Sequence, residues 1–292
     1  MIDFLNKLIA ANENEGDNAQ RPIISNDASS GFGSYDNLTG GFSSNSLNIF
    51  ASASKLGDDK LSLAQLFALN ILANQKAPSI YFTANKTRDE ILRKYYGIAL
   101  KLHPSLFSNE DLAREKIGEL RKNRGLASIK KTEFIDSTNW NTNRLVSTIR
   151  TKSRKDKLAF AVVDNIQFVQ AIPEYRENTR SDELRSVVTA LRELSREIQL
   201  PIIAISHVYH QYGDISRNLE MYDLEGSSCL EEIADTVTLF MLHKYYSPDE
   251  NEVLQRRSIE VKVAKNRFGA CGTLPFIWEN SDYSFYPDTD AD

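Results

Sequence analysis

Apolar residues along the chain gather into short runs of strand length that alternate with segments of helical periodicity. The strand-like runs consist mostly of Val, Ile, Leu, Phe and Ala and lie at 47–51, 80–82, 134–135, 158–163, 202–205 and 237–242. Apolar positions at helical spacing predict helices at about 61–74, 87–102, 109–122, 142–153 and 181–198. Near-continuous apolar strands separated by helices indicate a mostly parallel sheet that helices cover on both faces. The sequence therefore predicts an α/β fold.

The two ends of the chain depart from this alternation. Apolar residues at helical spacing within 2–11 predict a short amphipathic docking helix, which a polar linker follows. The segment 29–41 is rich in Gly, Ser and Asn and predicts only loop and turn. An antiparallel extension at one edge of the sheet is predicted by three alternating segments, 257–264, 272–278 and 283–286. We therefore expect an N-terminal arm and linker at 1–28 and one domain at 29–292.

Composition and charge narrow the class of protein without identifying it. The 292 residues are 41% hydrophobic and 26% charged, as in an ordinary globular protein. No apolar stretch reaches the roughly 18 residues of a membrane span, so we expect a cytoplasmic protein with no membrane partner. The formal net charge of −5 argues against a protein that grips nucleic acid over its whole surface. Cys229 and Cys271 lie far apart in the sequence, and neither belongs to a metal-binding motif, so both are predicted to be core thiols.

Two smaller features suggest chemistry but have a plainer interpretation. The basic segment 150–157 suits a phosphate contact, yet cations are also typical of the solvated end of a surface helix, and the sequence favours that second interpretation. Of the histidines, only His207 and His210 lie near each other. Because a third ligand is missing, no metal site is predicted.

Several motifs at strand ends and turns follow one another in a distinctive order. They are GFGSYDNLTGG at 31–41, VVDNIQ at 162–167, PIIAIS at 201–206, DL at 223–224 with AD at 234–235, and VAKNRFG at 263–269. From about Gly31 to Tyr286 the chain resembles the RecA-like motor domain of DnaB-type hexameric replicative helicases. The resemblance implies a RecA-like P-loop NTPase fold, without the family's N-terminal primase-binding domain.

The chain departs from the family's pattern at the phosphate-binding loop. A P-loop uses glycines whose backbone amides wrap the phosphates, a lysine that neutralises them, and a Ser/Thr hydroxyl on magnesium. Counted without gaps after the strand at 47–51, these positions are occupied in order by Ser52, Gly57, Asp58 and Asp59. Carboxylates therefore replace the lysine and the Ser/Thr, and they would repel a triphosphate.

Two further positions bear on the same reaction. The family's catalytic glutamate, which activates the attacking water, corresponds to Asn85, and an amide cannot take up a proton. Asp164 stands at the family's magnesium-binding aspartate, but its Ser/Thr partner is missing. We therefore expect no bound cofactor. In an alternative frame, Lys55 or Lys60 serves as the P-loop lysine, and the chain binds ATP and magnesium as an active enzyme.

The positions that face DNA in the family are also altered. The family's DNA-contacting loop corresponds to Glu225, Gly226 and Ser227, so a glutamate replaces an arginine and repels phosphate. The family's glutamine that links nucleotide to DNA falls in the segment that contains His207 and His210. Histidine can stack on bases, but it is weakly charged near neutral pH. We therefore expect weak or absent binding of single-stranded DNA.

The basic residues that act on a neighbouring subunit in the family are retained in this sequence. Lys265 and Arg267 match the residues that reach a neighbouring subunit's γ-phosphate in trans, although they also fit a strand with exposed basic residues. The departures together predict a degenerate, non-hydrolysing member that binds a DnaB-type helicase or like subunits, as a regulator, loader or inhibitor in DNA replication. Two alternatives remain: an active ATP-dependent DNA helicase or translocase with an unusual P-loop, and a self-assembling scaffold that reuses the fold.

Overall fold

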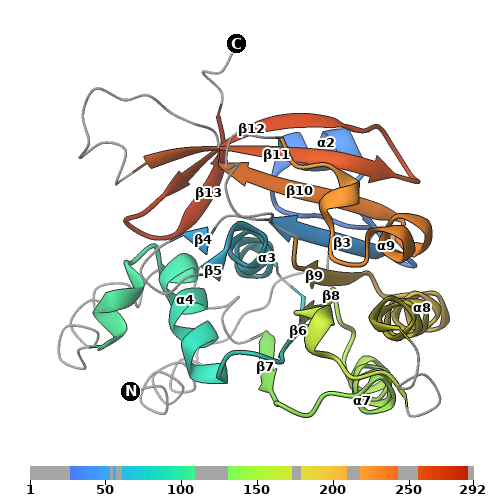
Figure 1. The fold of residues 1–292 in the computed structure, drawn as a ribbon. Coiled ribbons are helices and arrows are strands. Elements are labelled where there is room, and N and C mark those ends of the chain that lie inside the picture. The colour runs from blue at the N-terminus through green and yellow to red at the C-terminus, as the bar shows by residue number, and fades with distance from the viewer. Residues whose placement is uncertain are drawn as a thin grey trace.

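A nine-stranded sheet organises the chain, in the order β13-β12-β11-β10-β3-β9-β8-β6-β7 (Figure 1). The computed structural model describes residues 27–52, 55–56, 61–75, 77–108, 131–172, 179–208, 218–242 and 256–288. The sheet contains β3 (Leu47–Ser52), β6 (Ser79–Thr83), β7 (Thr132–Asp136), β8 (Phe160–Asp164), β9 (Ile202–Ser206), β10 (Thr236–Leu242), β11 (Arg256–Asn266), β12 (Gly272–Glu279) and β13 (Ser284–Pro287). Two small ribbons pair β1 (Asp27–Ala28) with β2 (Phe42–Ser43), and β4 (Lys55–Leu56) with β5 (Leu61–Ser62).

The pairing directions confirm the predicted mixed sheet. The strands from β10 through β3, β9, β8 and β6 to β7 are parallel to their neighbours. β11, β12 and β13 continue the sheet as antiparallel strands at the β10 side. All residues of β3, β6, β8 and β9 are buried, as their continuous apolar runs predict.

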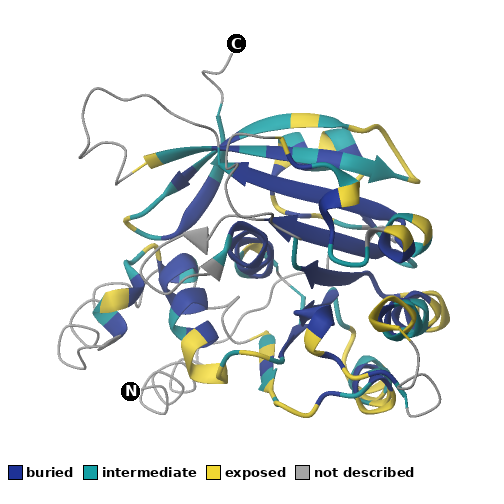
Figure 2. Ribbon diagram, in the orientation of Figure 1, coloured by how far each residue is buried: buried dark blue, intermediate teal, exposed yellow. Residues whose placement is uncertain are grey.

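Helices cover both faces of this sheet, as predicted. α3 (Leu63–Asn74) and α4 (Arg88–Leu100) contribute to one hydrophobic core, whereas α7 (Thr142–Lys155), α8 (Arg180–Ile198) and α9 (Ser227–Ile233) contribute to the other. Figure 1 shows these two groups on opposite sides of the sheet, and Figure 2 shows the buried strands between them. The short helices are α2 (Gly33–Thr39), η1 (Pro104–Ser108), η2 (Ile166–Phe168) and η4 (Met221–Asp223). None of the helices in the described ranges combines the length and apolar character of a membrane span.

The prediction of only loop and turn at 29–41 is wrong, because α2 lies within it. Tyr35 is 1% exposed, and its hydroxyl lies 2.9 Å from the Thr238 hydroxyl on β10. The Asp36 carboxylate accepts a hydrogen bond from the Ser30 amide, and Gly40 ends the helix with a φ of 80°. Tertiary contacts of a buried tyrosine therefore stabilise a helix that its Gly- and Ser-rich composition disfavours.

The start of one helix and the position of one cysteine differ from the sequence prediction. The helix predicted to begin at about 61 begins at Leu63, because residues 61–62 form β5. The prediction that both cysteines are core thiols is right for Cys229, which is buried, and wrong for Cys271, which is exposed. Cys271 lies in the connection between β11 and β12, where residues 267–271 are exposed. The helices predicted at 2–11 and 109–122 lie outside the described residues.

Candidate functional site

The carboxyl ends of four parallel strands bring the predicted site residues to one edge of the sheet. Ser52 ends β3, Asp164 ends β8, and His207 directly follows β9. Asn85 lies exposed in the turn that follows β6. In open α/β sheets this edge is where ligands bind.

Asp164 is buried and held by two other side chains. Its exposed fraction is 0%, and the Gln65 amide nitrogen donates to both carboxylate oxygens at 2.8 Å. The Tyr81 hydroxyl donates to the same carboxylate at 2.6 Å. Burial raises the pKa of Asp164 to about 6, although the hydrogen bonds from Tyr81 and Gln65 oppose the shift. The carboxylate that the sequence resemblance equates with the family's magnesium-binding aspartate is thus hydrogen-bonded by protein donors.

The start of α3 is also satisfied by the protein's own side chains. Ser62 is the N-cap residue, and its hydroxyl accepts from the backbone N–H of Gln65 at 3.2 Å, while the side-chain oxygen Oε1 of Gln65 accepts from the backbone N–H of Ser62 at 2.8 Å. The Ser52 hydroxyl accepts from the Ala64 amide at 3.2 Å. Backbone amides at a helix start are the groups that bind phosphate in P-loop proteins. Here three of them have intramolecular acceptors.

The sequence pattern did not identify Gln65 and Tyr81 as site residues. The spacing of Ser62 and Gln65 is that of a capping box, S-x-x-Q, and this signal could have placed the helix start at Leu63. Gly57, Asp58 and Asp59, the predicted P-loop positions, lie outside the described residues.

The positions near the family's DNA-contacting loop form a second cluster at the same edge. The Asn165 amide nitrogen lies 2.7 Å from Nε2 of His207, and Nδ1 of His207 lies 3.9 Å from the Glu225 carboxylate. Gly226 has a φ of 81° and begins α9, whose first residue is Ser227. The structure therefore brings His207 and Glu225 together, whereas His210 lies outside the described residues.

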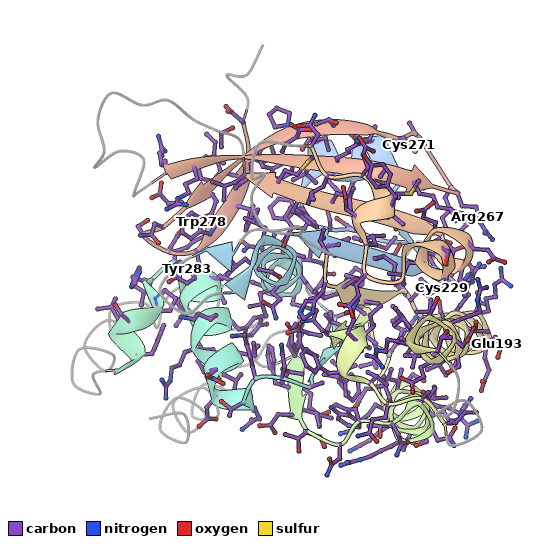
Figure 3. All side chains as sticks on the ribbon, in the orientation of Figure 1. Glu193, Cys229, Arg267, Cys271, Trp278 and Tyr283 are labelled. Atoms are coloured by element: carbon purple, nitrogen blue, oxygen red, sulfur yellow. The ribbon has the colours of Figure 1, made fainter. Side chains whose placement is uncertain are left out.

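Lys265 and Arg267 lie at the opposite edge of the sheet. The Asp235 carboxylate is buried and accepts hydrogen bonds from the Leu47 backbone amide, at the amino end of β3, and from Arg192 at 2.6 Å. It also lies 3.4 Å from Nε of Arg267. In Figure 1 the arrowheads of β3 and β10 point to the left, and Figure 3 shows Arg267 at the right of the molecule. The two basic residues therefore cannot serve the site at Asp164 in the same chain.

The two basic residues differ in their surroundings. The Lys265 ammonium donates to the carbonyl oxygens of Glu231 at 2.5 Å and Ala234 at 2.7 Å, at the carboxyl end of α9. Burial lowers the pKa of Lys265, and the charge of Arg267 lowers it further. Arg267 has a side chain that is 45% exposed. Lys265 therefore caps a helix of its own chain, whereas Arg267 keeps an exposed guanidinium.

Two further features of the sequence were the basic segment 150–157 and the possible metal ligands. Arg150 and Lys152 lie in the last turns of α7 and form ion pairs with Glu197 and Glu133, which agrees with the surface-helix interpretation. Within the described ranges, no group of three or more His, Cys, Asp or Glu side chains is arranged to hold a metal ion.

Comparison with known proteins identifies the family to which this geometry corresponds. The sequence model of the DnaB-like helicase C terminal domain matches residues 28–287. The chain belongs to this family. It is 26% identical over 284 residues to a probable replicative DNA helicase of Trieres chinensis, covering 92% of this chain and 58% of that protein. It is 27% identical over 267 residues to replicative DNA helicase DnaB of Geobacillus stearothermophilus, covering 87% and 55%.

The DnaB-like chain thus spans little more than half the length of these curated relatives. A solved DnaB-like replicative helicase, described together with its interactions with primase, superposes with a TM-score of 0.75 at 19% identity, over 98% of this chain and 66% of that one. The ATPase domain of the protein G40P superposes with a TM-score of 0.73 at 19% identity, over 98% of both chains. These two likenesses confirm the predicted fold.

Proposed function

We propose that this DnaB-like domain does not hydrolyse ATP and acts by binding a DnaB-type replicative helicase, or like subunits, in DNA replication. The observation that carries the proposal is the contact between Gln65 and Asp164. Because Gln65 lies in the first turn of α3 and contacts Asp164, we assign it to the position at which a P-loop has the Ser/Thr that holds magnesium. This assignment replaces Asp59, which the gap-free count of the sequence placed there.

Magnesium would have to displace Gln65 to reach Asp164. Hydrogen bonds to a charged group contribute about 1.5–3 kcal/mol each, so losing the pair from Gln65 costs on the order of 3 kcal/mol or more. Magnesium sheds its waters reluctantly and needs near-ideal octahedral ligands. A carboxylate with 0% exposure and three hydrogen bonds has about one of its four lone-pair sites left for a metal ion.

The position of the general base supports the same proposal. The resemblance places a glutamate where this chain has Asn85, on an exposed turn after β6. Because an amide does not accept a proton at neutral pH, a bound nucleotide would still lack an activated water. Two independent parts of the reaction centre are therefore missing.

The opposite edge of the sheet supports action on a partner. Arg267 is half-exposed, faces away from the chain's own site, and is oriented by the buried Asp235. We assign the trans-acting role to Arg267 alone, since Lys265 is committed to the carbonyls of α9. The exposed guanidinium would complete a neighbour's nucleotide site as an arginine finger. Glu225 in the DNA-contacting loop favours protein over single-stranded DNA as the partner.

The test is the ATPase rate of the cognate replicative helicase, together with its co-purification with this chain. We expect the two proteins to co-purify, and the ATPase rate to change several-fold on addition of the wild-type chain. Arg267→Ala should abolish the change in rate. Arg256→Ala provides a matched control, because Arg256 is exposed at the other end of the same strand, β11. No co-purification and no change in rate would contradict the proposal.

One alternative function has support from the relatives, which are named as replicative DNA helicases. An active helicase would retain Asp164 as its magnesium ligand. It predicts DNA-stimulated ATP hydrolysis by this chain that disappears in Asp164→Ala. Absence of hydrolysis by the wild-type chain, with and without single-stranded DNA, would exclude this alternative.

A further inference from the structure

Exposed aromatic side chains gather beside Glu225 at the carboxyl edge of the sheet. The large hydrophobic side chains with high exposure in the described ranges are Phe168 at 46%, Tyr222 at 62% and Phe268 at 45%. Phe168 contacts the edge of the His207 ring, with centroids 5.7 Å apart and ring planes at 89°. The Glu225 carboxylate lies 3.9 Å from Nδ1 of the same His207 ring. Phe268 lies at the amino edge, next to Arg267.

Both aromatic residues of this carboxyl edge are carried by rigid turns. Gln167 donates to the Ser206 hydroxyl at 2.8 Å and accepts from the His207 amide at 3.2 Å, which fixes the turn that carries Phe168. Tyr222 lies in η4, where the Glu220 amide donates to the buried Asp223 carboxylate at 2.9 Å. Aromatic groups that are already ordered lose little entropy on binding, so they are effective anchors for a protein partner.

The two turns meet through the segment that contains His207. Val208 and Leu224 form a β-bridge, and the Glu225 amide donates to the His207 carbonyl at 3.1 Å. The Phe168 ring packs on the His207 ring from the other turn, and Tyr222 lies in η4 just before Leu224. We call the surface of Phe168, His207, Tyr222 and Glu225 the aromatic edge.

The charge of the aromatic edge selects its partner. Within the described part of the chain, the Glu225 carboxylate forms no ion pair with a lysine or arginine, and its side chain is 35% exposed. Two cations on the neighbouring described segments are engaged elsewhere: Lys262 pairs with Glu220 at 2.5 Å, and Arg180 pairs with Glu183 and donates to the Gln167 carbonyl. An acidic group beside aromatic rings repels phosphate and attracts a guanidinium, which also stacks on aromatic faces.

We propose that the aromatic edge is a docking site for a protein segment that presents arginine beside an apolar residue. The arginine would pair with Glu225, and the apolar residue would pack on Phe168 or Tyr222. The proposal shares Glu225 with the argument for a protein partner given above, but its test involves neither nucleotide nor Arg267, so each proposal can fail without the other.

The experiment is fluorescence anisotropy of the full chain with a labelled peptide of alternating arginine and leucine. A glutamate–leucine peptide and oligothymidylate serve as comparison probes. We expect the arginine peptide to bind, and Phe168→Ala and Glu225→Arg each to weaken it about tenfold, the effect typical of an interface anchor. Phe268→Ala is the matched control and should leave binding unchanged, because its ring is equally exposed at the other edge.

Three results would overturn the proposal. They are equal binding of the arginine and glutamate peptides, equal loss in Phe168→Ala and Phe268→Ala, and tighter binding of oligothymidylate than of the arginine peptide. Thermal melting of each variant separates loss of binding from loss of folding, and Tyr222→Ala provides a second variant if Phe168→Ala does not fold.

Discussion

Asp164→Asn tests whether the carboxylate at the end of β8 is buried from solvent in the folded chain. Asp164 has a pKa of about 6 in the folded chain and 3.8 as its ordinary value. Between these two values the folded state binds more protons than the unfolded state, so stability falls as the pH rises. Integrated from about pH 4 to pH 7, this one group lowers the free energy of unfolding by about 2–3 kcal/mol. Asparagine does not titrate and removes that loss.

The assay is urea unfolding of the wild type and Asp164→Asn at a series of pH values, without magnesium. The result is read from how the difference in unfolding free energy between the variant and the wild type changes with pH. The difference also contains a pH-independent part, because the new side-chain amide at position 164 faces the side-chain amide of Gln65. We expect the variant to gain about 2–3 kcal/mol relative to the wild type between about pH 4 and pH 7. Asp156→Asn, at an exposed position, should show no such gain. A difference that stays constant within about 0.5 kcal/mol across this range would refute the reasoning.

Four further substitutions test other contacts in the structure. Gln65→Leu should lower the unfolding free energy by about 2–4 kcal/mol in urea unfolding, because Asp164 loses the Gln65 side-chain nitrogen that donates to both its oxygens and α3 loses its capping box. A loss below about 0.5 kcal/mol would contradict the contact. Arg192→Met should cost about 3–5 kcal/mol in the same assay, because the buried Asp235 loses its closest partner. Arg150→Met removes an exposed pair and should cost less than about 1 kcal/mol, so equal losses in the two variants would count against the buried pair. Asn85→Glu should not restore phosphate release from ATP, since the magnesium position remains filled, and measurable turnover would show that Gln65 does not block it.

The order and type of the main elements could be predicted because the buried strands are almost continuously apolar. β3, β8 and β9 pack against helices on both faces, and this demand leaves a clear pattern in the sequence. α2 could not be predicted in this way. Its residues are poor helix formers, and the helix depends on the burial of Tyr35 against β10, more than 200 positions away.

The candidate site was predictable in its location but not in its contacts. The resemblance identified Asp164 and Asn85 by their place after strands, and the structure puts both at the carboxyl edge. The role of Gln65 depends on where α3 begins, and a gap-free count from β3 cannot register an extra ribbon such as β4 and β5. Likewise, the difference in role between Lys265 and Arg267 could not be predicted, because Lys265 is held by backbone carbonyls at the end of α9 and such contacts have no sequence pattern.

Calorimetric titration of the wild-type chain with ATP in the presence of magnesium measures directly whether the site at Asp164 binds the nucleotide. Because Gln65 and Tyr81 occupy the Asp164 carboxylate, we predict no magnesium-dependent heat of binding at up to about millimolar ATP, an upper limit that corresponds to about −4 kcal/mol. Micromolar ATP binding that disappears when magnesium is chelated would contradict the account.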